Sequence, residues 1–151
     1  EIRRVTEVMS TLNKKAAEIM DGYEVHACTD VTGFGLMGHS LEMAKGSGVE
    51  IRIRKQDVPV LPRVRELAEQ GLVPGGSKNN YAHVQDHVIF PEEMDETDRY
   101  ILCDAVTSGG LLISVGPDEA ERLLQELVDA GVEAKLIGEV TAQHSGQIVI
   151  E

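Results

Sequence analysis

Residues 29–39 (TDVTGFGLMGH) constrain the fold of this chain more than any other segment. They follow the short stretch 25–28, which predicts a strand, and lead into residues 36–45, whose apolar side chains recur at helical spacing. The glycines of the segment are Gly33, Gly35 and Gly38. Glycines at such a junction let the backbone turn sharply and let a ligand approach the helix N-terminus. The sequence therefore predicts a strand–turn–helix unit here.

Helical and strand patterns are mixed along the rest of the chain. Helices are predicted at residues 3–20, 62–70, 95–104 and 117–128, and strands at 49–54, 87–90, 111–115, 135–140 and 147–150. Residues 72–86 are rich in Gly, Pro and Asn and are predicted to form a loop. The mixture indicates an α/β or α+β fold class. With 151 residues the chain fits a single domain, in which residues 1–22 hold a leading helix and 23–151 hold the sheet and the other helices.

The chain is strongly acidic, with 14 Lys and Arg against 26 Asp and Glu and a net charge of −12. Such a surface repels phosphate backbones and anionic lipid, so we expect neither a nucleic-acid nor a membrane partner. All of the excess negative charge lies in residues 79–151, where solvated acidic helices would explain it. In residues 1–78 the numbers of acidic and basic side chains are equal. Two cysteines are too few for a disulfide scaffold and indicate a reducing, cytoplasmic compartment.

The glycines of residues 33–38 also form the bare dinucleotide-binding pattern GxGxxG. Its usual context is weak here. Asp30 and Thr32 stand where apolar strand residues are expected, and the stretch 49–55 ends in Arg54 and Lys55 rather than in an acidic residue. A dinucleotide-binding module is therefore kept as an alternative.

Asp30 stands at the predicted end of a strand, beside the glycine turn. A carboxylate in this place suits Mg²⁺, which takes one or two protein carboxylates together with phosphate oxygens. An aspartate that caps the following turn would need the same residue type. From local chemistry alone the two interpretations are equally favoured.

Two further segments could contact phosphate. The loop that includes Gly75, Gly76, Lys78 and Asn80 lacks the Gly-Lys-Ser/Thr order of a P-loop, so a plain turn is the simpler interpretation. A second short stretch, Thr107, Ser108 and Gly109, precedes a predicted strand and would form either an anion-binding nest or a tight connection.

Other candidate ligands and nucleophiles carry weaker signals. His83 and His87 are four residues apart, but no further metal ligands follow in a recognised spacing. Cys28 and Cys103 are expected to be small buried hydrophobic side chains rather than nucleophiles. No catalytic residue is assigned in this chain.

Several of these segments together resemble the selenophosphate synthetase (selenide, water dikinase) family, part of the aminoimidazole ribonucleotide synthetase superfamily. The resemblance begins with residues 29–39 and continues, in the family's order and spacing, through 41–44, 71–76 with Asn79 and Asn80, 104 with 107–112, and 137–140. It concerns the C-terminal half of the family only. Ala105 and Val106 depart from the Asp-Pro-Gln-Thr that the family has there, which puts the bend imposed by proline in doubt.

The resemblance implies a layered fold with a mixed β-sheet and flanking helices. It implies an enzyme that uses ATP, selenide and water to make selenophosphate, AMP and phosphate, for selenocysteine and selenouridine synthesis. Asp30 matches a Mg²⁺ ligand of that family, and the 75–80 and 107–110 segments would lie near the same ATP phosphates. The catalytic lysine, the reactive Cys or Sec and the other metal ligands would belong to an N-terminal half. We therefore expect an inactive piece of a longer, homodimeric enzyme, or else an interaction domain that has lost its chemistry.

Overall fold

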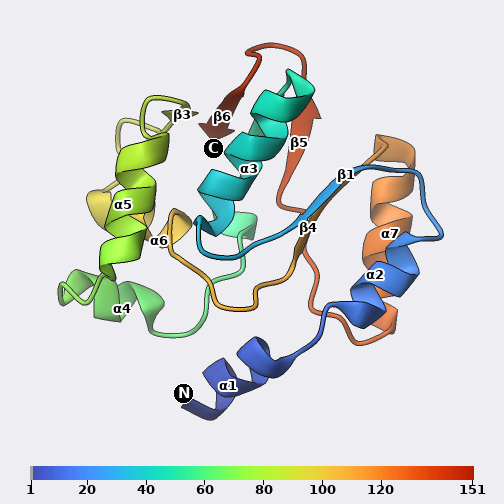
Figure 1. Cartoon of the computed structure of the whole chain (residues 1–151), viewed down its shortest axis with the longest axis horizontal. Coiled ribbons are helices and arrows are strands. Elements are labelled where there is room, and N and C mark those ends of the chain that lie inside the picture. The colour runs from blue at the N-terminus through green and yellow to red at the C-terminus, as the bar shows by residue number, and fades with distance from the viewer. Residues whose placement is uncertain (1) are drawn as a thin grey trace.

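The computed structural model describes residues 2–151 and is shown in Figure 1. In chain order its elements are α1 (Ile2–Ser10), α2 (Lys14–Met20), β1 (Val25–Asp30), α3 (Gly35–Ser47), β2 (Glu50–Ile53), a 3₁₀ turn (Lys55–Asp57), α4 (Val64–Glu69), α5 (Gly75–Val84), β3 (Val88–Ile89), α6 (Glu96–Leu102), β4 (Leu111–Val115), α7 (Pro117–Asp129), β5 (Gly138–Thr141) and β6 (Gln147–Ile150). No helix among the described residues is long and apolar enough to cross a membrane.

The strands form two separate sheets. β1 and β4 make an antiparallel pair, in which Asp30 lies opposite Leu111. The other sheet has the order β3–β6–β2–β5 and is mixed, because β2 runs parallel to β6 and antiparallel to β5. The expected mixed sheet with flanking helices is therefore confirmed, and the β1–β4 pair is an addition to it.

The core lies between α3 and the four-stranded sheet. Met37 and Ala44 of α3 are fully buried, and they belong to the same cluster as Ile53 of β2 and Ile148 of β6. The Met and Ile side chains each contribute about 1.5–3 kcal/mol of hydrophobic free energy when they are fully buried. Since α3 also contacts α5, α6 and β1, this central helix fixes where the turn before it, residues 31–34, must lie.

The predicted helix over residues 3–20 is wrong in its length, because the structure divides it into α1 and α2. The break falls at residues 11–13. Asn13 Nδ2 donates a hydrogen bond to the carbonyl of Gly109, at 2.9 Å. A contact with a residue so far along the chain leaves no periodic signal in the sequence.

The prediction of a loop over residues 72–86 is also wrong, because α5 occupies Gly75–Val84. Gly and Asn disfavour helices by roughly 0.5–1 kcal/mol each, which is why the composition indicated a loop. Three side chains of this helix, Ser77, Asn80 and Val84, are buried at the spacing of one helical face. Tertiary contacts of that face outweigh the poor propensity.

Strand β5 begins three residues later than predicted, at Gly138. A Cβ atom at this position would overlap the backbone carbonyl of Arg52 on the neighbouring strand. Glycine therefore permits the close approach with which β5 starts its pairing to β2.

A buried carboxylate begins β2. Glu50 is fully buried and accepts hydrogen bonds from Arg52 Nε at 2.8 Å and from Thr141 Oγ1 at 3.0 Å, and its other oxygen contacts His144 Nδ1. Burial opposes the ionisation of Glu50, but these hydrogen bonds outweigh it and the pKa of Glu50 is lowered. The ionised carboxylate thus ties β2 to the end of β5 and to the turn before β6.

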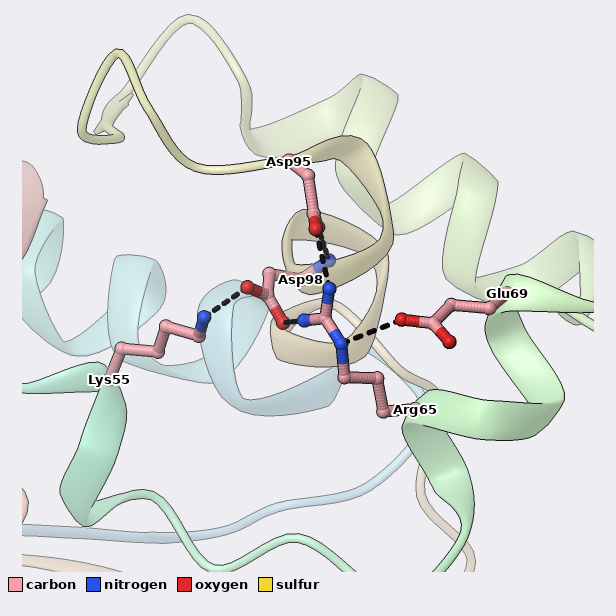
Figure 2. A network of polar contacts seen from close by, with 5 residues as sticks. All are labelled: Lys55, Arg65, Glu69, Asp95 and Asp98. Atoms are coloured by element: carbon pink, nitrogen blue, oxygen red, sulfur yellow. Dashed lines mark hydrogen bonds and ion pairs between the residues drawn. The ribbon is translucent and has the colours of Figure 1, made fainter.

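Figure 2 shows a second polar network, which joins the 3₁₀ turn, α4 and α6. Asp98 is nearly buried and pairs with both Lys55 and Arg65. Arg65 also reaches Asp95 at 2.6 Å and Glu69 at 2.8 Å. Asp95 caps α6 by accepting the Asp98 backbone N–H at 2.8 Å, and this bond, followed by the one from Arg65, lowers the pKa of Asp95. Lys55 and Arg65 are both paired with carboxylates inside this network. Since Arg65 lies on α4 and Asp98 on α6, the ion pairs stabilise the packing of these two helices.

Candidate functional site

Asp30 is the last residue of β1 and its side chain is exposed to solvent. The backbone around it is fixed, since the Val31 N–H donates to the Gly110 carbonyl at 2.9 Å beyond the β1–β4 pairing. Within residues 2–151 no hydrogen bond or ion pair occupies the Asp30 carboxylate. The side chain therefore does not cap the following turn, and it presents a free, hard oxygen ligand at a fixed place.

The turn after Asp30 is held against the segment that follows α6. The Thr32 carbonyl accepts the Gly35 N–H at 2.9 Å and the Val106 N–H at 3.0 Å. Gly35 has φ = +67°, and a Cβ atom there would lie 2.5 Å from the Asp104 carbonyl oxygen. Only glycine combines this backbone conformation with so close an approach. Gly35 thus has a structural role in addition to any contact with a ligand.

A histidine that the sequence analysis did not single out braces the same turn. His39 is almost buried in α3, where its Nε2 lies 3.2 Å from Thr32 Oγ1 and its Nδ1 lies 3.1 Å from Glu42 Oε2. The Phe34 ring packs against it with centroids 5.7 Å apart. The position of His39, four residues after Gly35 on the same helix, was the available signal.

The N-terminus of α5 meets both the glycine turn and the end of α6. Asn80 Nδ2 donates to the carbonyls of Gly33, at 2.9 Å, and Cys103, at 3.0 Å. Ser77 Oγ donates to Asp104 Oδ1 at 2.5 Å and accepts the backbone N–H of residue 105 at 3.4 Å. Asn80 is thus a bridge between two backbone turns rather than an exposed amide.

The hydrogen bond between Ser77 and the N–H of Ala105 bears on the departure from the family's sequence. Proline has no N–H and could not make this contact. Alanine keeps this N–H, so in this chain the hydroxyl of Ser77 can hold the backbone just after Asp104.

The connection from α6 to β4 packs closely against the backbone of residue 31 just before β4 begins. A Cβ atom on Gly109 would overlap the Val31 carbonyl, and Ser108 takes a positive φ of 52°. Thr107 and Ser108 are exposed, whereas Gly109 is buried and its carbonyl accepts the Asn13 side chain. Gly109 is needed for the close packing, and Thr107 and Ser108 are the members of this group that face solvent.

The structure thus brings three predicted segments together: the turn 30–35, the start of α5, and residues 103–109. Gly75 and Gly76 open α5, where backbone N–H groups have no partner within the helix. Lys78 is exposed, and its Nζ lies 6.0 Å from the centre of the Tyr100 ring on α6. Among the described residues, no hydrogen bond or ion pair joins Lys78 to Asp30. The Lys78 ammonium therefore lies beside α6 rather than beside the Asp30 carboxylate.

The other predicted candidates stand apart. Among residues 2–151 no group of three or more His, Cys, Asp and Glu side chains is arranged to hold a metal ion. Burial raises the pKa of Cys103 to about 12, which fits the expected inert thiol. The expectation that Cys28 is buried is wrong, because it lies on an exposed position of β1.

The strands on either side of α3 do not form the unit that a dinucleotide fingerprint requires. That unit is a parallel βαβ crossover within one sheet. Here β1 pairs antiparallel with β4, while β2 belongs to the other sheet. The glycines of residues 33–38 therefore serve a different connection.

Curated proteins match this chain over most of its length. The chain is 45% identical over 150 residues to a selenide, water dikinase of Myxococcus xanthus, covering 98% of this chain and 43% of that protein. It is 49% identical over 121 residues to a selenide, water dikinase of Caldanaerobacter subterraneus, covering 80% of this chain and 35% of that protein. The chain therefore spans less than half the length of the curated relatives it matches.

Solved structures show the same fold. The hydrogenase maturation protein HypE of E. coli matches with a TM-score of 0.66 at 23% identity, over 94% of this chain and 37% of HypE. Thiamine-monophosphate kinase of Stenotrophomonas maltophilia matches with a TM-score of 0.55 at 15% identity, over 87% of this chain and 33% of the kinase. The model of the family described as AIR synthase related protein, C-terminal domain, matches residues 3–151. This chain belongs to the family of AIR synthase related C-terminal domains.

Proposed function

We propose that this chain is the C-terminal domain of an ATP-dependent selenide, water dikinase. The reaction converts ATP, selenide and water to selenophosphate, AMP and phosphate, and its product is the selenium donor for selenocysteine and selenouridine. The observation that carries the proposal is the 45% identity to a selenide, water dikinase over 98% of this chain. The related fold of HypE, solved in one case in complex with ATP, supports the use of the nucleotide.

Asp30 is proposed as a Mg²⁺ ligand. Its carboxylate is exposed, unpaired within the described residues, and fixed at the end of β1. One carboxylate does not make a site by itself, but Mg²⁺ is commonly held by one or two carboxylates, with phosphate oxygens and water completing its shell. Asp30 fits this role if the nucleotide and further carboxylates come from the rest of the polypeptide. When bound, the ion would neutralise charge on the phosphates.

The residues around Asp30 would position phosphate groups. Gly33 and Gly35 shape the turn beside it, and Gly75 and Gly76 offer backbone N–H groups at the start of α5. Phosphoryl transfer depends mainly on positioning and on charge neutralisation, so a domain that supplies one carboxylate and a rigid turn would contribute directly. Lys78, Thr107 and Ser108 are exposed and are proposed to contact phosphate from the edge of this surface.

We further propose that the partner of this domain is the remainder of the same polypeptide, in a cytoplasmic homodimer. The chain covers only 43% of its Myxococcus relative. No catalytic nucleophile or lysine is assigned to this chain, and its described residues contain no cluster of metal ligands. We therefore expect the isolated chain to fold without turning over ATP.

The test is a chimera in which this chain replaces the matched region of the Myxococcus enzyme. AMP release from ATP would be followed with selenide and Mg²⁺, and selenophosphate would be identified by its ³¹P NMR signal. Selenide-dependent formation of both products by the chimera, and by neither part alone, is the expected result. A folded chimera that forms neither product would refute the proposed function and leave an interaction domain as the better interpretation.

A further inference from the structure

Helix α1 exposes a large part of its apolar surface. Of its described residues none is buried. Ile2 is 86% exposed, Val5 38% and Met9 41%, and Leu12 just after the helix is 79% exposed. In Figure 1 α1 lies at the edge of the molecule, away from both sheets, with the N-terminus at its tip. An amphipathic helix normally turns such residues toward a core.

The exposed apolar residues lie on one face of α1. Ile2, Val5 and Met9 follow the i, i+3, i+7 spacing, which at about 100° per residue confines them to a stripe roughly 60° wide. Arg3 and Glu7 occupy the opposite face of the helix. We call Ile2, Val5 and Met9 the apolar stripe.

No residue of the apolar stripe is buried in the described part of the chain. Among residues 2–151, the polar side-chain contact that joins α1 to a distant part of the chain is the ion pair of Arg4 with Glu133. Ion pairs between exposed side chains contribute about 0–1 kcal/mol. A helix of nine residues is also too short to be stable alone in water. The apolar stripe is thus the surface of α1 on which a further partner would add most to the stability of the helix.

The size of the stripe decides between candidate partners. Stable association of two separate proteins buries about 800 Å² on each, which requires some 20–30 residues rather than three. A partner on the same polypeptide needs far less surface, because tethering raises its effective concentration to the millimolar range. The overall charge of −12 also disfavours an anionic membrane surface. The stripe suits a partner that is covalently linked.

We propose that the apolar stripe of α1 docks onto the part of a longer polypeptide that precedes this domain. The family is by description a C-terminal domain, and the curated relatives are more than twice as long as this chain. In such a protein α1 is the element that directly follows the preceding part. The inference rests on the proposed function for the existence of that part, and it adds the surface that joins the two.

The test measures amide hydrogen exchange of α1 in the isolated 151-residue chain and in the chimera with the Myxococcus enzyme. We expect α1 to exchange at least ten times more slowly in the chimera. Val5→Ser/Met9→Ser should remove this protection. Arg3→Ser/Glu7→Ser places the same number of serines on the opposite face and should retain it. Since no residue of α1 is buried among residues 2–151, neither variant should alter the melting temperature of the isolated chain.

Each outcome decides the proposal. Equal exchange rates of α1 in the chimera and in the isolated chain, or equal loss of protection in both variants, would overturn it even if the chimera is active. Protection that appears in the isolated chain with rising protein concentration, or on adding phosphatidylserine vesicles, would overturn it in favour of a second copy or a membrane. Protected α1 in an inactive chimera would support docking while the proposed function fails.

Discussion

Replacing Gly35 by alanine should destabilise the fold sharply. The positive φ of 67° costs an L-residue about 1–2 kcal/mol. The new Cβ would also lie 2.5 Å from the Asp104 carbonyl oxygen and 2.9 Å from the Cys103 carbonyl oxygen. Both are backbone atoms, so the strain requires movement of the chain after α6, which adds about 1–3 kcal/mol. The expected loss is therefore about 3 kcal/mol, a large share of the ~5–15 kcal/mol typical of a domain.

Two other glycines separate the cost of the positive φ from the cost of the steric overlap. Gly48 has a similar φ of 64°, but its nearest neighbour would be the Ser145 hydroxyl at 3.6 Å, so Gly48→Ala should cost only the ~1–2 kcal/mol for backbone conformation. Gly33 has a negative φ and no atom within 4 Å, so Gly33→Ala should change stability by less than about 1 kcal/mol.

Urea unfolding followed by circular dichroism measures the series. With a slope of about 2 kcal/mol per molar urea, Gly35→Ala should lower the midpoint by about 1.5 M. If Gly35→Ala costs no more than Gly48→Ala, the close packing of the glycine turn against the segment after α6 is refuted.

Three further changes test the surrounding contacts. Asn80→Ala should cost about 2 kcal/mol in urea unfolding, because two backbone carbonyls lose their donor, and Asn80→Asp should cost more, because it points an acceptor at both. Asp98→Asn should cost about 1–3 kcal/mol, whereas Glu69→Gln, at the exposed edge of the same network, should cost less than about 0.5 kcal/mol; equal losses would contradict the central place of Asp98. The pKa of Glu50 is lowered in the folded chain, so its stabilising effect is complete above the unfolded value of about 4.3 and is lost progressively as pH falls below that value toward the lower folded pKa. Thermal melts from pH 6 to pH 3 should show a smaller pH-dependent loss in Glu50→Gln than in the unchanged chain, and parallel curves would refute this role.

Elements with a strong local pattern were predictable from sequence. The strand over 111–115 and the strand over 147–150 have the predicted bounds, and the acidic first turn of α7 begins where Pro117 indicated it. In each case hydrophobic periodicity and turn residues favour the same structure, so no distant contact is needed to choose it.

The wrong predictions concern elements whose structure depends on contacts with residues far away along the chain. The helix over 75–84 forms from poor helix formers because Asn80 and Ser77 bind backbone and side-chain groups some 23 to 47 residues away along the chain. A predicted loop containing a buried Ser-x-x-Asn-x-x-x-Val face could have been examined for helical spacing. The break between α1 and α2 depends likewise on Asn13 reaching Gly109. Neither contact is encoded by local propensity.

The sequence predicted which segments form the candidate site better than it predicted what each residue does there. Asn80 contacts Gly33 and Cys103, and Gly110 contacts Val31, so the 75–80 and 107–110 segments both adjoin the turn after Asp30; their contact with phosphate stays a prediction. The resemblance implied that all of these residues lie near phosphate. In the structure Asn80 and Gly109 are buried, and Asp30 is exposed. Side-chain direction in the 75–80 segment could not be derived while it was predicted to be a loop.

The proposed role of Asp30 as a Mg²⁺ ligand is tested by the Mg²⁺ dependence of AMP release in the chimera with the Myxococcus enzyme. Asp30→Asn should leave the melting temperature unchanged and should lower activity at limiting Mg²⁺ by roughly tenfold or more, as expected for loss of a metal-site contact. Asp86→Asn replaces an exposed carboxylate two residues after the last residue of α5; it is the matched control and should behave like the unchanged chimera. An Asp30→Asn chimera with the same Mg²⁺ titration curve as the control would contradict the account.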